Sequence, residues 1–273
     1  MKFNLKTSKR ELGLTLVSLA AVAAAAVPSA GASAANAVAH PNVTIVLEHG
    51  AWADGSSWDG VVARLQEDGY SVDVPPNPLR GPSTDAAYLA SYLKTLSGSI
   101  VLVGQSYGGF VTTDAATGNS SVKALVYVDA YIPAKGETID SINKKFPGSE
   151  LAPSALSFVP SARGVVDVYI KPNQFRAILA NDLSATQAAQ LAATQRPIAA
   201  SALSEPSGVP AWTSIQTWDI IGTEDHAIPV AAQEFMAKRA HANVTEIKAS
   251  HMSMISQPDK VAAVIEAAAK KVN

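Results

Sequence analysis

Short apolar or β-branched runs alternate with amphipathic stretches through most of the chain. Runs without polar alternation are typical of strands that are covered on both faces. One such run lies at about 43–47, and further strands are predicted at about 70–74, 99–103, 124–128, 217–221 and 244–248. Apolar residues at helical spacing predict helices at about 58–68, 83–96, 109–116, 230–240 and 258–271. This alternation predicts an α/β protein with a mostly parallel sheet and helices on both faces.

The alternation fails between about residues 133 and 210, where prolines are dense. Short helical patches remain at 172–183 and 185–193. We therefore expect an inserted cap of small helices rather than a self-sufficient domain. Its large apolar residues either line a substrate pocket or pack the cap onto the core, and these are Phe146, Leu151, Phe158, Val159, Tyr169, Ile170 and Phe175.

The first 37 residues have the pattern of a secretory signal peptide followed by a linker. A basic start at residues 2–10 precedes an apolar run at 12–27 and several small-residue A-x-A sites. We expect cleavage after a residue between Ala32 and Ala37, and hence a secreted or periplasmic protein with no stable membrane association. Residues 38–273 would form the mature domain with its cap.

Composition excludes several classes of function. The 273 residues are 48% apolar, which is enough for a sizeable core, and the formal net charge is −2. Without a basic run beyond the leader, the chain is not expected to bind nucleic acid. It contains no cysteine, so disulfides, thiolate nucleophiles and thiolate metal ligands are excluded.

The strand expected at 99–103 leads directly into Gly104-Gln105-Ser106-Tyr107-Gly108. A G-x-S-x-G sequence between a strand and a helix places its serine on a sharp turn, with the hydroxyl clear of the sheet. Glycines on both sides let strand and helix approach where a Cβ would clash. Ser106 is therefore a candidate nucleophile, and a serine hydroxyl needs a neighbouring base to become reactive.

A base and an acid follow later strands at the same edge of the sheet. His251 comes after the last predicted strand, at the edge where open α/β folds place their sites. Asp225 follows the strand at 217–221 and is our preferred partner for orienting the imidazole, with Glu224 and Asp129 as alternatives. For Asp129 we favour a turn cap or a supporting hydrogen bond.

An oxyanion formed by attack of the serine needs preorganised N–H donors. We expect them to be the backbone N–H groups of Ala51, after the first strand, and Tyr107, at a helix start that favours anions. Trp52 and Gln105 lie beside these positions and are candidate substrate-binding residues, although Trp52 could simply pack. His49 is expected to hold the loop rather than to act as a second base.

Four segments together resemble the α/β-hydrolase superfamily, namely His49-Gly50-Ala51-Trp52, Gly104–Gly109, Tyr127-Val128-Asp129-Ala130 and Ser250-His251-Met252. Within it, the chain looks like the small bacterial esterases that are similar to the plant methylesterase and hydroxynitrile lyase group, over about residues 42–272. The order of Ser106, Asp225 and His251 is that of the superfamily.

The resemblance implies an α/β-hydrolase fold with a catalytic triad of Ser106, Asp225 and His251, and with no cofactor or metal. Ala51 and Tyr107 take the oxyanion roles. This chain departs from the usual pattern beside the site. Gln105 stands where histidine is common, and the residue before His49 is often apolar but here is Glu48. Both could tune substrate choice or a local pKa.

The expected function is that of a secreted serine carboxylesterase acting on small to medium esters through an acyl-enzyme. Alternatives on the same scaffold are a hydroxynitrile lyase-like or perhydrolase activity, and a lipase or polymer esterase. The non-enzyme alternative is a catalytically dead ligand-binding protein. Gly50 and Met252 follow the esterase pattern, because that lyase branch typically has threonine and lysine there. The implied partner is a small-molecule ester, with the oligomeric state left open.

Overall fold

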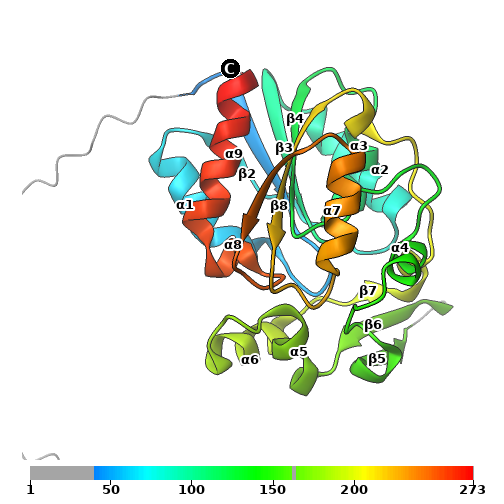
Figure 1. Ribbon diagram of the computed structural model, residues 1–273. Coiled ribbons are helices and arrows are strands. Elements are labelled where there is room, and N and C mark those ends of the chain that lie inside the picture. Colours follow the sequence, from blue (N-terminus) through cyan, green and yellow to red (C-terminus); the bar gives the residue numbers. More distant parts are fainter. Residues whose placement is uncertain (1–39, 162–163, 273) are drawn as a thin grey trace, which may run out of the picture. The chain divides into compact units, whose positions relative to one another are not determined.

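The structure is a computed structural model that describes residues 40–161 and 164–272 (Figure 1). The expected signal peptide and its cleavage site lie outside these residues. The boundary expected between residues 37 and 38 lies outside them as well and stays a prediction. No helix within the described ranges is long and apolar enough to cross a membrane.

Six parallel strands form the main sheet, in the order β2-β1-β3-β4-β8-β9. They are β1 (Val43–Glu48), β2 (Ser71–Asp73), β3 (Ser99–Gln105), β4 (Val122–Val128), β8 (Gln216–Gly222) and β9 (Asn243–Ile247). The central strands are almost entirely buried because helices cover both faces, which explains their continuous apolar runs. The predicted parallel sheet is confirmed.

Two groups of helices cover the faces of this sheet (Figure 1). One face carries α1 (Asp59–Glu67), α8 (Ser253–Ser256) and α9 (Pro258–Val272), and the other carries α2 (Pro82–Leu93), α3 (Gly108–Ala115) and α7 (Val230–Arg239). In α9, Val261 and Ile265 are fully buried at helical spacing. This alternation is the doubly covered α/β arrangement that the sequence predicts.

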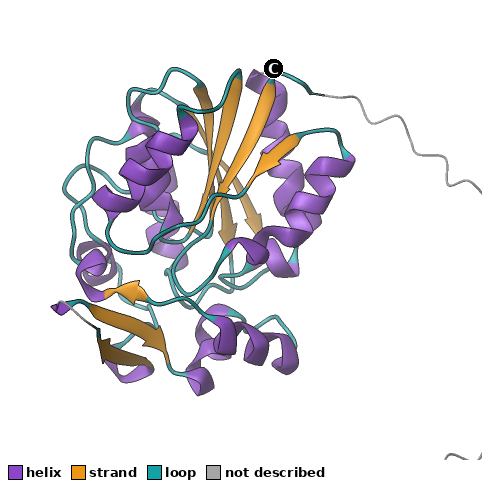
Figure 2. Cartoon of the chain, turned by 180° about the vertical axis from the view of Figure 1, so that it is seen from behind, coloured by secondary structure: helices purple, strands orange, loops and turns teal. Residues whose placement is uncertain are grey.

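Between β4 and β8 the chain leaves the main sheet and forms a cap near the carboxyl ends of the parallel strands (Figure 2). Its helices are α4 (Ile139–Lys145), α5 (Pro172–Leu179) and α6 (Ala185–Thr194), of which the last two match the predicted patches. The cap also contains an antiparallel sheet that was not predicted, made of β5 (Leu156–Pro160), β6 (Val166–Ile170) and β7 (Ile198–Ala199). Pro160 is compatible with it because it ends an edge strand.

The cap is anchored to the core by specific polar contacts. The indole N–H of Trp52 donates to the carbonyl of Val168 in β6 at 2.9 Å. Arg80 forms a half-buried ion pair with Asp167 at 2.7 Å and also donates to the carbonyl of Pro197 at 3.0 Å. These contacts attach the cap strands to the loops that follow β1 and β2.

Asp219 is a fully buried carboxyl group in the middle of β8. Neither of its oxygens has a hydrogen-bond partner within the described part of the chain. Burial, and secondarily the charge of Asp129, raises its pKa well above the ordinary value of 3.8. The folded protein therefore holds this proton more tightly than the unfolded chain, and stability falls as the pH rises above that ordinary value.

We expect the variant Asp219→Asn to gain thermal stability relative to wild type as the pH rises, because asparagine does not titrate. The measurement is Tm by calorimetry for both proteins between pH 4.5 and 8. As a control, Glu234→Gln removes an exposed carboxyl on α7 and should leave the pH dependence of Tm unchanged. A Tm difference between Asp219→Asn and wild type that stays constant with pH would contradict the assignment.

Candidate active site

Ser106 lies on the turn between β3 and α3 with φ of 54°, in the left-handed region. Such a backbone costs on the order of 1–3 kcal/mol and persists only where the surroundings impose it. Here the Ser106 N–H donates to Val128 at 3.3 Å, and its carbonyl accepts from the Tyr131 N–H at 3.3 Å. A Cβ on Gly104 would lie 2.7 Å from the carbonyl oxygen of Gly108, so the close approach of strand and helix requires glycine.

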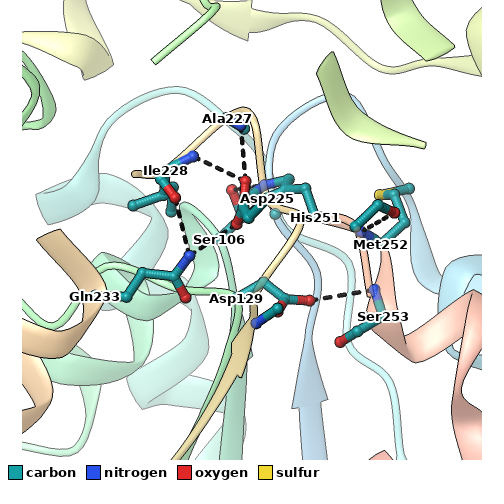
Figure 3. Close-up of polar contacts among 12 residues, drawn as sticks. Ser106, Asp129, Asp225, Ala227, Ile228, Gln233, His251, Met252 and Ser253 are labelled. Atoms are coloured by element: carbon teal, nitrogen blue, oxygen red, sulfur yellow. Dashed lines mark hydrogen bonds and ion pairs between the residues drawn. The ribbon is translucent and has the colours of Figure 1, made fainter. Parts of the chain in front are cut away.

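His251 lies between Ser106 and Asp225 (Figure 3). Its Nε2 is 2.7 Å from Ser106 Oγ, and its Nδ1 is 2.8 Å from Asp225 Oδ2. All three residues are buried, with exposed fractions of 5%, 2% and 6% for Ser106, His251 and Asp225. With the proton of the neutral ring on Nδ1, Nε2 accepts from the serine hydroxyl, an arrangement suited to nucleophilic catalysis.

Asp225 is held by donors on both of its oxygens. Oδ1 accepts the backbone N–H groups of Ala227 at 2.7 Å and Ile228 at 2.9 Å. Oδ2 accepts from Gln233 Nε2 at 2.9 Å as well as from the imidazole of His251 (Figure 3). These donors fix the orientation of the carboxylate toward the ring.

Gln233 is a supporting residue that the sequence reasoning did not identify. Its side-chain amide also donates to the carbonyl of Ile228 at 3.0 Å, so it links α7 to the loop that carries Asp225. A signal is present in the sequence, because Gln233 shares the buried face of α7 with Ala232 and Met236. A polar residue at an apolar position of a helix needs a buried partner.

The two alternative acids, Glu224 and Asp129, contact residues other than His251. Glu224 forms an ion pair with Lys248 at 3.5 Å on the outside of the loop. Asp129 accepts the N–H of Gly222 at 2.8 Å and that of Ser253 at 3.2 Å, so it joins the two loops that carry the acid and the histidine. Neither carboxylate is hydrogen-bonded to His251 in residues 40–161 and 164–272.

Buried charges set the protonation of this site. Burial by itself lowers the pKa of His251, but Asp225 and, further away, Asp129 raise it above the ordinary value of 6.5. Burial and then the charge of Asp225 raise the pKa of Asp129 to about 7. The neutral imidazole that can accept a proton therefore prevails only at a pH above the raised pKa of His251.

The loop after β1 is held by His49. Its Nε2 accepts the N–H of Asn77 at 3.1 Å, so its Nδ1 carries the proton and donates to the carbonyl of Gly50 at 2.9 Å. This is the loop-holding position expected for His49. The neighbouring Glu48 is buried, and burial followed by the charge of Asp85 raises the pKa of its carboxyl well above 4.5.

A small cavity of about 60 Å³ opens above Ser106. One water position needs about 10–15 Å³, so the cavity admits a group of only a few atoms. Ala51, Trp52 and Tyr107 line it together with Ser106. The rest of its wall is mostly apolar and consists of Tyr131, Ile139, Asp140, Asn143, Leu151, Leu156, Ile198, Leu203 and Ile228.

Some of the large apolar residues of the cap take one of the two expected roles. Leu151 lines the cavity, whereas Ile170 and Phe175 are fully buried within the packed core. Phe158 and Val159 do neither, because they are 51% and 46% exposed on β5. Only part of this set could therefore contact a bound group.

The structure places Gln105 differently from the expected substrate-binding position. Gln105 is 1% exposed and is not among the described residues that line the cavity. Its Oε1 accepts the N–H of Gly50 at 3.1 Å, and its Nε2 donates to the carbonyl of His251 at 3.0 Å. Its amide is thus engaged within the protein, beneath the site. Trp52, in contrast, does lie in the cavity wall.

No group of three or more histidine, cysteine or acidic side chains in the described ranges is arranged to hold a metal ion. The polar residues at the cavity include Ser106, whose hydroxyl contacts the imidazole of His251 behind it, as well as Asp140 and Asn143. This arrangement can activate a hydroxyl as a nucleophile toward an electrophilic carbon.

The model of the alpha/beta hydrolase family matches residues 45–264. The carbendazim hydrolyzing esterase of Nocardioides sp. (strain SG-4G) is 31% identical over 113 residues. The match covers 37% of this chain and 47% of that protein, so it spans less than half of that relative. The pyrethroid hydrolase of Sphingobium wenxiniae is 26% identical over 247 residues, covering 81% of this chain and 85% of that protein.

Among solved structures, polyneuridine aldehyde esterase is similar in fold, with a TM-score of 0.70 and 19% sequence identity. The likeness covers 83% of this chain and 98% of that one. At this identity the likeness shows the fold alone. The match of the family model to residues 45–264 confirms the family that the motifs indicated, and the chain belongs to the alpha/beta hydrolases.

Proposed function

We propose that this protein is a serine carboxylesterase that acts on small esters. The observation that carries the proposal is the buried chain of hydrogen bonds from Ser106 through His251 to Asp225. As Ser106 Oγ attacks the ester carbonyl, His251 Nε2 takes the hydroxyl proton, and the carboxylate of Asp225 stabilises the imidazolium that forms. His251 then gives this proton to the departing alcohol, which leaves an acyl-enzyme on Ser106.

Water completes the cycle by the same groups. His251 takes a proton from water as it attacks the acyl carbonyl, and it returns that proton to Ser106 Oγ as the acid leaves. In both steps the carbonyl oxygen becomes an oxyanion. We assign its stabilisation to the backbone N–H groups of Ala51 and Tyr107, because both residues line the cavity beside Ser106 and Tyr107 caps the start of α3.

The size of the cavity supports a small ester as substrate, and the relatives support ester hydrolysis. A cavity of about 60 Å³ favours a short acyl or alcohol group over a long chain. The two relatives described above are named for the hydrolysis of carbendazim and of pyrethroids. We extend ester hydrolysis from them to this chain, without extending either substrate.

The lyase alternative has less support from the loop after β1. A Cβ on Gly50 would lie 2.6 Å from the Cβ of Ser106, so the threonine typical of that branch does not fit this loop. A purely ligand-binding role has less support as well, because the nucleophile, base and acid are in hydrogen-bond contact. Export remains part of the proposal and rests on the basic and apolar pattern of the leader.

Turnover of a p-nitrophenyl ester series tests this function. We expect hydrolysis of the acetate and butyrate esters, with kcat/KM falling for octanoate and longer chains because the cavity is small. Stoichiometric fluorophosphonate should abolish the activity and label the peptide that contains Ser106. Activity that survives labelling, or labelling elsewhere, would contradict the serine mechanism, and a preference for long chains would contradict the assigned substrate size.

A further inference from the structure

Gln105 connects two loops that lie far apart in the sequence. It accepts a hydrogen bond from Gly50, 55 residues before it, and donates one to the carbonyl of His251, 146 residues after it. We propose that Gln105 is a positioning residue that aligns the oxyanion loop with the loop of the catalytic histidine. The inference rests on the proposed esterase function and adds to it a residue that acts through two others.

The contact with Gly50 bears on the direction of the oxyanion donor. The carbonyl of Gly50 and the N–H of Ala51 belong to one planar peptide group. His49 donates to that carbonyl at 2.9 Å, and Gln105 Oε1 accepts the Gly50 N–H at 3.1 Å on the other side of the same residue. Because hydrogen bonds hold both the N–H and the carbonyl of Gly50, the peptide group that carries the Ala51 N–H is fixed in orientation.

The space around Gly50 shows how closely these groups pack. A Cβ at this position would lie 2.5 Å from Gln105 Oε1 and 2.6 Å from the Cβ of Ser106. The loop therefore lies against both the nucleophile and the residue before it. A displacement of the Gln105 side chain would be transmitted directly to this loop, because close-packed interiors transmit strain.

The other end of the amide acts on the histidine. Gln105 Nε2 donates to the backbone carbonyl of His251 at 3.0 Å, while the ring of His251 contacts Ser106 and Asp225. Two residues further along, the N–H of Ser253 donates to Asp129. The backbone of the histidine loop is thus held by Gln105 and Asp129, and at Ser250 also by Asp182.

Only a side chain with a donor and an acceptor at its tip makes both contacts. A primary amide supplies both without a charge, which suits a group that is 1% exposed. An ionised carboxylate accepts only, so it would place a negative oxygen against the carbonyl of His251. A protonated carboxyl has one O–H donor and one acceptor oxygen, and so it can replace the amide.

The variant Gln105→Glu therefore allows a test by pH. We expect the ratio of its kcat to that of wild type to be highest at the acidic end of the measurable range. The ratio should fall by about tenfold or more as the introduced carboxyl ionises, since misplacing one oxyanion donor costs up to about 10²–10³-fold. KM should change little. His251 titrates in both proteins, so dividing the kcat of the variant by that of wild type removes the pH dependence that the two share.

Gln105→Met serves as a second variant, because it keeps the length of the side chain and lacks both hydrogen bonds. We expect a lower kcat with nearly unchanged KM, and a ratio to wild type that does not vary with pH. If Gln105→Glu fails to fold, as judged by circular dichroism and Tm, then Gln105→Met decides the proposal through a lower kcat at nearly unchanged KM. A wild-type kcat in Gln105→Met would overturn it.

Gln195 provides a matched control within the cap. Its amide also both accepts and donates, accepting from the N–H of Ile170 and donating to the carbonyls of Ile170 and Ala192, all at 2.9 Å. Gln195→Glu should give a kcat ratio to wild type that is independent of pH. Wild-type kcat in Gln105→Met together with wild-type activity at every pH in Gln105→Glu would overturn the positioning role alone, whereas absence of both ester turnover and Ser106 labelling in wild type would overturn the proposed function.

Discussion

Replacing Ser106 with alanine is expected to lower kcat on a p-nitrophenyl ester by about 10⁴-fold or more, because the covalent route is lost with the hydroxyl. The residual rate would come from the oxyanion donors and from binding. KM should change much less than kcat, since the cavity wall is otherwise intact. Active-site titration and steady-state kinetics on purified Ser106→Ala, with wild-type contamination excluded by fluorophosphonate, measure this effect.

Ser57→Ala is a suitable control for that experiment. Ser57 is also a buried serine, but its hydroxyl donates to the carbonyl of Asp54 in the short turn before α1. Its loss should leave kcat close to that of wild type. If Ser106→Ala retained wild-type turnover, the nucleophile would have to be sought elsewhere and the proposed mechanism would be abandoned.

The second large effect is expected for Asp225→Asn, with a loss in kcat of about 10³–10⁴-fold. Asparagine can offer an N–H to the imidazole and so stabilise the wrong tautomer, and it no longer stabilises the imidazolium. Burial opposes the charged ring, and the charge of Asp225 is the main cause that raises the pKa of His251. The acid limb of kcat/KM should therefore move to lower pH in the variant, while the maximum falls.

Glu224→Gln is the neighbouring control for this variant. Its carboxylate pairs with Lys248 at 3.5 Å on the outside of the loop, so its neutralisation should leave both kcat and the pH profile nearly unchanged. The reverse result, with full activity in Asp225→Asn and a large loss in Glu224→Gln, would transfer the role of the acid. The pH profile of kcat/KM between pH 5 and 9 distinguishes these outcomes.

The parallel sheet and the placement of Ser106 could be predicted because each rests on a local pattern. Continuous apolar runs indicate strands covered on both faces, and the G-x-S-x-G turn needs only its own neighbours. The positions of His251 and Asp225 followed from a simple topological rule, since both come directly after strands whose ends share one edge. The structure brings these two residues into hydrogen-bond contact with each other and with Ser106.

The positions of Gln105 and Gln233 could not be obtained in this way. Their partners depend on the direction of a buried side chain and on loops that approach only in the folded chain. The cap sheet was missed for a related reason, because β5, β6 and β7 are short and pair with one another across intervening helices or turns. Strands of this length carry little periodicity, and tertiary pairing decides their conformation.

The hydrogen bond from Trp52 to the cap strand has a consequence for how such an enzyme can change. The same indole forms part of the cavity wall and one of the attachments of the cap to the core. A smaller residue here would enlarge the cavity and release the cap in a single step. A substitution of Trp52 that broadens the substrate range would therefore also loosen the cap over the site. Directed evolution would need a compensating attachment elsewhere in the cap to separate the two effects.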